Sequence, residues 1–309
     1  SKNDYLQNVW DAYRVDGKLY YVIPSFYIST MVGKESIFGD RTSITMEELQ
    51  TIRDTMPEGT ALFSDETRDS FLYTMMNYCG SDFVDVSTGK YAAGLPVEYG
   101  EDYWGEDYWN NYESQFREDR TLLDGISISN IRDLNGTING VFGEDISFVG
   151  FPTDGDMGSI LWAGNRMYAL SAKSKNLDGA WEFLRYYLTQ EYQDKIQEYN
   201  LPVLRSTFEK NVQDATKKPY YTDENGNKVE YDETYYINGE EILLPQLTQE
   251  QVDRIVSFVE SVNKRGYYNE AISNIISEEA GAYFSGQKSA RDVAGVIQSR
   301  VQVYVNENR

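Results

Sequence analysis

The sequence predicts a protein of the α/β class. Segments typical of strands alternate with segments typical of helices over most of the chain, and the C-terminal part carries only helical patterns. At roughly 150 residues per domain, a length of 309 residues predicts two domains. A chain of this length buries roughly three quarters of its unfolded surface, so we expect a sizeable core.

The first elements are predicted before residue 81. We expect a strand at residues 18–23, which follows an Asp-Gly turn dipeptide and is ended by Pro24. Thr45 and Glu48 form a capping-box pattern that starts a helix. A second, apolar helix is predicted over residues 64–80.

Three further strand patterns follow, at residues 121–128, 146–151 and 165–172. The polar loop at 152–159 holds two aspartates among glycines, but it lacks the EF-hand spacing, so we expect no metal there. An Asn-Gly dipeptide at 225–226 predicts a hairpin.

Asn176 is predicted to cap a helix with an apolar stripe, and because Trp181 lies on this stripe we expect it in the core. Ser206 and Glu209 form a further capping-box pattern. Three C-terminal helices are predicted, the first after Thr248. The other two begin near residue 267 and after residue 289, and the apolar faces of all three are typical of packing surfaces.

Charge and composition exclude several classes of function. The formal charge is −22, from 28 basic and 50 acidic residues, so we expect no nucleic-acid partner and no affinity for anionic membranes. The chain has no histidine and one cysteine, Cys79, which excludes a Ser-His-Asp triad, an imidazole metal site and an internal disulfide. Cys79 lies in the apolar helix and is expected to be a buried thiol.

Aromatic residues are abundant: 26 Tyr, 13 Phe and 5 Trp. Tyr and Trp combine a flat apolar face with a polar atom, which suits carbohydrate binding; a Tyr-rich source proteome is the equal alternative. Trp104 and Trp109 lie in an acidic, aromatic stretch at 98–115. Its aromatic residues form either a core-facing stripe or the rim of a ligand cleft.

No catalytic motif is present. The chain lacks a Gly-rich phosphate loop, a Gly-x-Ser-x-Gly elbow and a Cys-x-x-Cys pair. A glycosidase would need two carboxylates, and 50 acidic residues make some pair inevitable, but nothing in the sequence selects one. No run of 18 apolar residues predicts a membrane span.

Several short segments occur in an order and spacing that one known family shares. The most specific is Gly-Phe-Pro-Thr at 150–153, followed by 171–176 and 179–184; the others are 16–26, 201–203, 286–289 and 297–307. Together they resemble the extracellular solute-binding proteins of carbohydrate ABC transporters, the maltose-binding-protein-like family 1. The closest resemblance is to its Gram-positive lipoproteins.

The resemblance implies a periplasmic-binding-protein-like fold of type II, in which hinge strands join two α/β lobes around a ligand cleft. The implied division has four parts. They are a remnant of lobe one with the first hinge strand at 1–23, lobe two at 24–162, a return to lobe one at 163–245 (hinge strand, helices and hairpin), and C-terminal helices packing on lobe two at 246–309.

Members of this family begin with an α/β segment of lobe one that is preceded by a signal peptide and a lipid-bearing cysteine. Neither precedes the first hinge strand in this sequence, so we expect an incomplete first lobe. Cys79 lies mid-chain and is not the lipid-bearing cysteine. Any membrane association is expected only through a lipid anchor outside this chain, on a cell-surface lipoprotein.

The implied activity is that of a monomeric, cofactor-free receptor and not of an enzyme. It captures a sugar or oligosaccharide outside the cell and delivers it to ABC transporter permease subunits. The alternatives are a glycosidase with an acidic pair and a ligand-sensing subunit for a membrane kinase. The implied ligand-binding residues are Trp162, Tyr27, Asp65, Arg68, Trp104, Trp109 and Tyr267. Core packing is the alternative for Tyr27, and helix capping is the alternative for Asp65 and Arg68.

Overall fold

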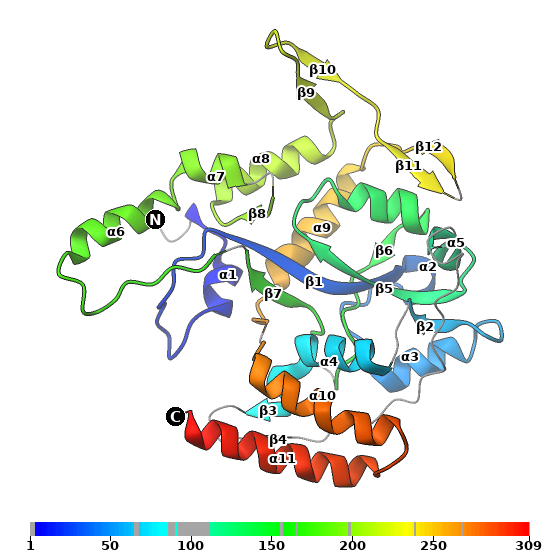
Figure 1. Cartoon of the computed structure of the whole chain (residues 1–309). Coiled ribbons are helices and arrows are strands. Elements are labelled where there is room, and N and C mark those ends of the chain that lie inside the picture. Colours follow the sequence, from blue (N-terminus) through cyan, green and yellow to red (C-terminus); the bar gives the residue numbers. More distant parts are fainter. Residues whose placement is uncertain are drawn as a thin grey trace. The chain divides into compact units, whose positions relative to one another are not determined.

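The computed structural model describes residues 4–64, 68–85, 90–91, 112–154, 157–164, 166–196, 199–237, 239–266 and 268–308 (Figure 1). Side chains are described throughout these ranges except at 68–70, 79–85 and 90–91, so the environment of the Cys79 thiol lies outside them. The chain forms two compact units. Unit 1 comprises Ser1–Ser64 and Glu106–Arg265, and unit 2 comprises Asp65–Gly105 and Gly266–Arg309. The predicted boundaries between lobes stay a prediction.

Unit 1 is built around a six-stranded mixed sheet whose central strand is β1 (Ser25–Lys34). β1 pairs antiparallel with β5 (Thr121–Ile128), β6 (Ile146–Ser147), β7 (Ile160–Ala163) and β8 (Leu201–Pro202), and β5 pairs in parallel with β2 (Ala61–Phe63). Side chains alternate between the two faces of a strand. Phe26 and Ile28 therefore point into the core, whereas Tyr27 and Ser29 lie on the opposite, less buried face.

The described part of unit 1 contains nine helices. They are α1 (Gln7–Ala12), α2 (Glu35–Phe38), α3 (Met46–Arg53), α5 (Tyr112–Arg117), the π-helix η2 (Gly136–Phe142), α6 (Leu177–Tyr186), α7 (Gln190–Ile196), α8 (Arg205–Ala215) and α9 (Gln249–Ser261). Side chains from α1, α8, α9 and η2 join those of the sheet in one apolar cluster. These four helices therefore hold the sheet in place through apolar contacts.

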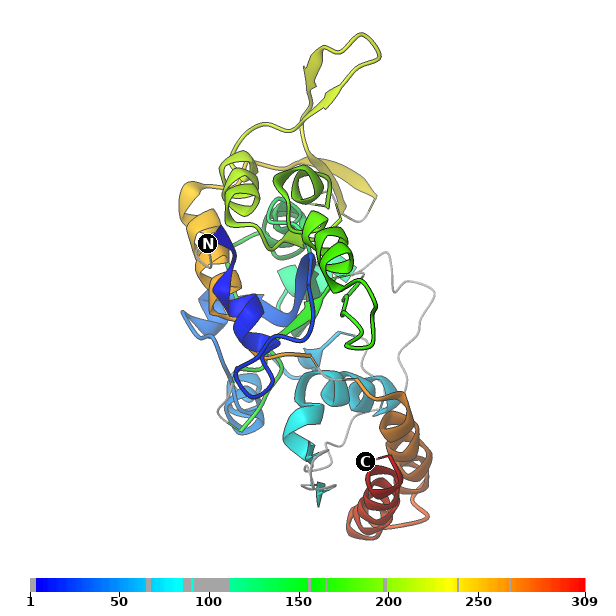
Figure 2. The ribbon, with the colours of Figure 1, turned by 90° about the vertical axis from the view of Figure 1, so that its left-hand side faces the viewer.

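Two hairpins follow α8. β9 (Tyr220–Thr222) pairs with β10 (Lys228–Glu230), and β11 (Thr234–Ile237) pairs with β12 (Glu240–Leu243). The first hairpin confirms the Asn-Gly prediction, because Gly226 has a φ of 84°, which glycine adopts without strain. This hairpin stands out from the rest of unit 1 in two perpendicular views (Figure 1, Figure 2).

Unit 2 contains α4 (Arg68–Phe83), α10 (Glu270–Phe284), α11 (Ala290–Glu307) and the short pair β3 (Val84–Asp85) and β4 (Lys90–Tyr91). Its core joins Met76 of α4 to the apolar faces of α10 and α11, which lie side by side in both views (Figure 2). Asn269 and Ser289 cap the two C-terminal helices with their side chains, and Ser289 confirms the predicted start of the last one.

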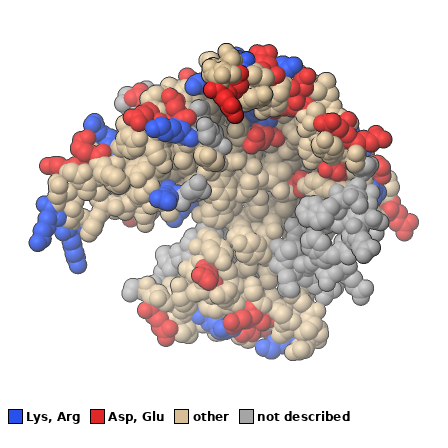
Figure 3. Space-filling model, turned by 45° about the horizontal axis from the view of Figure 1, so that its top comes forward, with Lys and Arg blue, Asp and Glu red and all other residues tan. Residues whose placement is uncertain are grey.

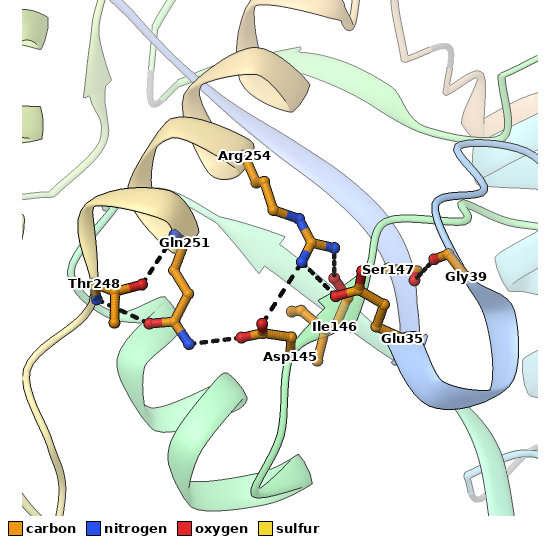
Figure 4. A network of polar contacts seen from close by, with 8 residues as sticks. All are labelled: Glu35, Gly39, Asp145, Ile146, Ser147, Thr248, Gln251 and Arg254. Atoms are coloured by element: carbon orange, nitrogen blue, oxygen red, sulfur yellow. Dashed lines mark hydrogen bonds and ion pairs between the residues drawn. The ribbon is translucent and has the colours of Figure 1, made fainter.

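A polar network attaches α9 to the end of the sheet (Figure 4). The Arg254 guanidinium pairs with Glu35, lies 3.7 Å from Asp145 Oδ2 and donates to the carbonyl oxygen of Ile146 at 3.1 Å. Gln251 Nε2 donates to Asp145 Oδ1 at 2.6 Å, while the Gln251 backbone N–H donates to Thr248 Oγ1 at 3.2 Å. α9, predicted in the C-terminal group of helices, is therefore part of unit 1.

The structure corrects two predicted hinge strands. Residues 18–23 form no strand; they make only isolated bridges, one of which joins Val22 to Tyr168. The second predicted strand, at 165–172, has only the bridge between Tyr168 and Val22 in its described residues. Pro24 precedes β1 instead of ending a strand. Proline has no N–H group, but directly before a strand this removes no hydrogen bond from the ladder. Residues 18–23 have no neighbouring strand with which they could form a ladder.

Other local predictions have mixed outcomes. The capping box predicted at Thr45 forms, and the helix predicted after Thr248 begins there, with a capping box that was not predicted. α8 begins at Arg205 after Leu204, without the predicted side-chain cap from Ser206. The predicted strand at 146–151 is limited to β6. Trp181, expected in the core, is 44% exposed.

Candidate functional site

Two predicted ligand residues lie together on the less buried face of the sheet. Tyr27 of β1 and Trp162 of β7 are register partners, and their rings are stacked with centroids 6.4 Å apart at an angle of 20°. Both side chains are half-buried. Because cross-strand partners share a face, this pairing places two aromatic rings next to each other on one face of the sheet.

Hydroxyl groups lie next to these rings on the same face. Ser29 is two residues beyond Tyr27, and its register partner on β5 is Ser127. The two Oγ atoms are 3.5 Å apart. We call Tyr27, Ser29, Ser127 and Trp162 the aromatic-hydroxyl strip. It combines apolar ring faces with groups that both donate and accept hydrogen bonds.

Tyr13 holds one end of the strip in place. Its hydroxyl oxygen accepts a hydrogen bond from the backbone N–H of Ala163 at 2.5 Å, directly after Trp162. The Arg265 guanidinium lies over the Tyr13 ring, 4.8 Å from its centroid, and burial raises the pKa of the Tyr13 hydroxyl. The residue after Trp162 is therefore fixed by a buried, neutral phenol.

Nothing in the described part of the structure places the other predicted site residues at this strip. Asp65, Trp104, Trp109 and Tyr267 lie outside the described residues, as does the side chain of Arg68, which begins α4. Tyr268, which follows Tyr267, is half exposed. Its ring meets that of Tyr73 edge to face at 6.4 Å within unit 2.

Sequence reasoning missed a buried carboxyl group, that of Asp124 on β5. It accepts hydrogen bonds from the Tyr112 hydroxyl at 2.5 Å and from Ser64 Oγ at 3.3 Å. Burial raises the pKa of Asp124 to about 6, although these bonds act in the opposite direction. The available indication was an aspartate inside an otherwise apolar strand pattern, since such a residue must be satisfied internally.

The described residues contain no group of three or more acidic, cysteine or histidine side chains that could hold a metal ion. No helix in the described part of the chain is both long and apolar enough to cross a membrane.

Comparisons with known proteins identify the fold and the family. The family described as bacterial extracellular solute-binding protein matches residues 1–219. A search of curated proteins finds no match.

Solved structures match almost the whole chain. The acarbose-binding GacH receptor of Streptomyces glaucescens is similar at 15% identity with a TM-score of 0.52, covering 99% of this chain and 76% of that one. The cyclic α-maltosyl-1,6-maltose binding protein of Arthrobacter globiformis is similar at 15% identity with a TM-score of 0.51, covering 99% of this chain and 77% of that one. A family 1 solute-binding protein of Alicyclobacillus acidocaldarius is similar at 10% identity with a TM-score of 0.52, covering 99% of this chain and 76% of that one.

These likenesses confirm the predicted α/β, periplasmic-binding-protein-like fold with a helical C-terminus. The family match covers more than half of the chain. This chain belongs to the bacterial extracellular solute-binding protein family.

Proposed function

We propose that this protein is the receptor of a carbohydrate ABC transporter, which binds a sugar or oligosaccharide outside the cell and delivers it to the permease subunits. The observation that carries the proposal is the aromatic-hydroxyl strip. Pyranose rings have apolar C–H faces that pack on aromatic rings, and their hydroxyl groups exchange hydrogen bonds with serine hydroxyls. Tyr27 with Trp162, and Ser29 with Ser127, supply both kinds of contact side by side.

The comparisons support a glycan ligand. The GacH receptor was solved with acarbose, and the Arthrobacter globiformis protein is described as binding a cyclic maltosyl-maltose. The family consists of receptors without enzymatic activity, which confirms the prediction of a non-enzyme and disfavours the glycosidase alternative.

The remaining features of the proposal follow the family resemblance. The ligand would lie between two lobes, with Asp65, Arg68, Trp104, Trp109 and Tyr267 contributing contacts in addition to the strip. The receptor would act as a monomer, held at the cell surface by a lipid anchor of the Gram-positive type. Binding would stabilise the closed arrangement of the lobes through contacts made only in that state.

A thermal-shift panel of maltodextrins, other oligosaccharides and short peptides tests the ligand class. A ligand that binds only the folded state stabilises it by RT ln(1 + [L]/Kd), about 2.7 kcal/mol at a hundredfold excess over Kd. We expect a rise in Tm with at least one glycan. A rise with peptides and with no glycan would contradict the sugar assignment.

Two substitutions then test the strip itself. Trp162→Ala and Tyr27→Ala should each weaken glycan binding at least tenfold, measured by calorimetry, because each removes one stacking surface. Tyr236→Ala is the matched control, since Tyr236 is an aromatic residue of unit 1 that is 61% exposed on β11. Trp162→Phe separates binding from folding: it keeps a flat ring and should retain part of the affinity. Equal affinity in all four variants would show that the glycan binds elsewhere.

A further inference from the structure

Gly125 of β5 extends the aromatic-hydroxyl strip by one position. It lies two residues before Ser127 and therefore belongs to the same face of the sheet. Its register partner on β1 is Met31, two residues beyond Ser29. Gly125 and Ser127 are exposed, whereas Met31 is 2% exposed and ends the open part of this face. The open face therefore passes from aromatic rings through hydroxyl groups to a position without a side chain.

A glycine inside a strand usually has a structural reason. Glycine costs backbone entropy and leaves no side chain to pack, so it marks a positive φ, a bulge or the close approach of another group. Gly33 of β1 has such a reason, because a Cβ atom at this position would collide with the ring of Phe38. The fold of unit 1 therefore requires glycine at position 33.

None of these reasons applies to Gly125 in the described part of the protein. It is not among the residues with a positive φ. The pairing of β1 with β5 runs without a break from Ile28–Ile128 to Val32–Asp124, so no bulge occurs here. No atom lies within 4 Å of the position that a Cβ atom would take. The fold accommodates a larger residue at this position, so the free space above Gly125 is available to a ligand.

The strip is longer than a single pyranose ring. Tyr27 and Met31 are four residues apart on β1, and four residues of a strand span about 13 Å. A sugar ring that packs on Tyr27 and Trp162 therefore leaves Ser29 and Gly125 free for a further unit of the same ligand.

The charge of the protein limits the kind of glycan. The chain carries a net charge of −22, and acidic side chains occur in several groups on the face shown in Figure 3. Such a field repels anions. The four residues of the strip and Gly125 are all uncharged. A neutral glycan fits this surface better than a uronic acid or a sugar phosphate.

We propose that Gly125 forms the floor of a second sugar subsite, and that the ligand is a neutral oligosaccharide lying across β7, β1 and β5. The first ring packs on Trp162 and Tyr27, and the next unit passes over the serine hydroxyls to Gly125. The missing side chain lets this unit approach the backbone of β5. Gly125 is thus a specificity-determining position that admits ligands of two or more units. This inference rests on the proposed function.

Glycans of one to four units test the subsite. Malto-, xylo- and N-acetylchito-oligosaccharides, which are neutral, are titrated by calorimetry into the wild type, G125A and G125V. We expect the wild type to bind the longest members at least tenfold more tightly than the shortest member that binds. G125V should lose most of this gain, and G125A should lose less, because valine fills more of the space over β5.

Stability separates a role in binding from a role in folding. G125V should have a Tm equal to or higher than that of the wild type, since valine is favoured in strands and its Cβ would meet no atom within 4 Å. T234V is the matched control, because it places the same residue at an exposed position of β11 in unit 1. It should bind every glycan as the wild type does.

Cysteine labelling tests the position of the ligand directly. G125C and T234C, each combined with C79S, are labelled with a maleimide in the presence and absence of glycan. The longest glycan that binds should slow the labelling of G125C at least tenfold, and it should leave the labelling of T234C unchanged.

Four results would overturn the inference and leave the proposed function intact. They are equal affinity of the wild type for monosaccharides and longer glycans, unchanged glycan affinity in G125V, a lower Tm in G125V, and unprotected labelling of G125C by a bound glycan. Absence of binding to any glycan would instead contradict the proposed function, and this inference with it.

Discussion

Asp124 illustrates how a single buried side chain makes stability depend on pH. Its carboxyl group is 5% exposed, accepts hydrogen bonds from Tyr112 and Ser64, and has its pKa raised from 3.8 to about 6 by burial. The folded state therefore holds a proton that the unfolded state releases between pH 4 and 6. The stability that this proton provides is complete below pH 4 and is lost as the pH rises through 6.

Asp124→Asn should remove this part of the pH dependence. A shift of two pKa units corresponds to roughly 3 kcal/mol. Between pH 4 and 7, the free energy of unfolding of the wild type should therefore decline relative to that of the variant by up to this amount. Urea titrations at four pH values measure it. Parallel curves for the two proteins would show that Asp124 is ionised in the folded state throughout this range.

At the scale of residues, the sequence indicates only those features of a side chain's environment that follow from its own segment. Tyr27 and Trp162 could be named as candidates, but their stacking could not be predicted, because the sequence alone does not determine the register of β1 against β7. The partners of Asp124 could not be found, since Ser64 and Tyr112 are 60 and 12 residues away and become neighbours only through the fold.

At the scale of elements, η2 depends on a close fit between a glycine and a tyrosine ring. A Cβ atom at Gly140 would lie 2.8–3.0 Å from three ring atoms of Tyr235 on β11. The turn is also held by Arg117, whose Nη2 donates to the carbonyl oxygens of Asn139 and Gly140 at 2.9 and 2.8 Å. The π-helix therefore has little freedom to move away from the hairpin.

Gly140→Ala should lower the free energy of unfolding by about 1–3 kcal/mol, the usual cost of overpacking. Gly295→Ala is the control: no atom lies within 4 Å of its Cβ position in α11, and helix propensity predicts a gain of about 0.5–1 kcal/mol. Guanidinium unfolding of both variants gives the comparison. Equal stability of the two variants would refute the close fit.

The Arg254 network makes a second prediction for an element. Arg254→Met keeps the apolar stem but removes the charge that Glu35 and Asp145 share, so Tm should fall by an amount equivalent to about 1 kcal/mol. Arg185→Met is the control, because the Arg185–Glu182 pair is more than half exposed and should contribute less than about 0.5 kcal/mol. If both variants lost the same stability, the network would have no special role in attaching α9.

The helix starts after Thr45, Thr248 and Ser289 were predictable and the hinge strands were not, for one physical reason. A capping box such as Thr45 with Glu48 is complete within four residues, so the sequence contains both partners. A strand needs a neighbour from elsewhere in the chain. Residues 18–23 have a composition typical of a strand but form no ladder, whereas β1 begins immediately after Pro24 and pairs with four other strands.

For the molecule as a whole, the charge of −22 makes a prediction about salt. Net repulsion among carboxylates opposes the compact state, and raising the ionic strength from 0.01 to 1 M shortens the Debye length from about 30 to about 3 Å. The unfolding free energy should rise by on the order of 1 kcal/mol, equivalent to about 2–4 °C in Tm. Sodium chloride and potassium chloride should act alike, and a fall in Tm with either would contradict the repulsion argument.

The fold class followed from the order of strand and helix patterns, and the family followed from short segments spread along the chain. The predicted division into lobes came from the family resemblance and stays a prediction, whereas the two compact units, each assembled from two distant stretches of sequence, cannot be derived from local patterns. Local patterns contain no information about which stretches meet.

The discontinuity of unit 2 also constrains the order in which the protein folds during synthesis. The residues of α4 leave the ribosome about 200 positions before those of α10 and α11, yet Met76 shares its apolar cluster with Ile272 and Val301. Contacts this distant in sequence form slowly. Unit 1 can collapse around β1 before α10 and α11 have been made, whereas the apolar side of α4 stays uncovered until both of these helices have been synthesised.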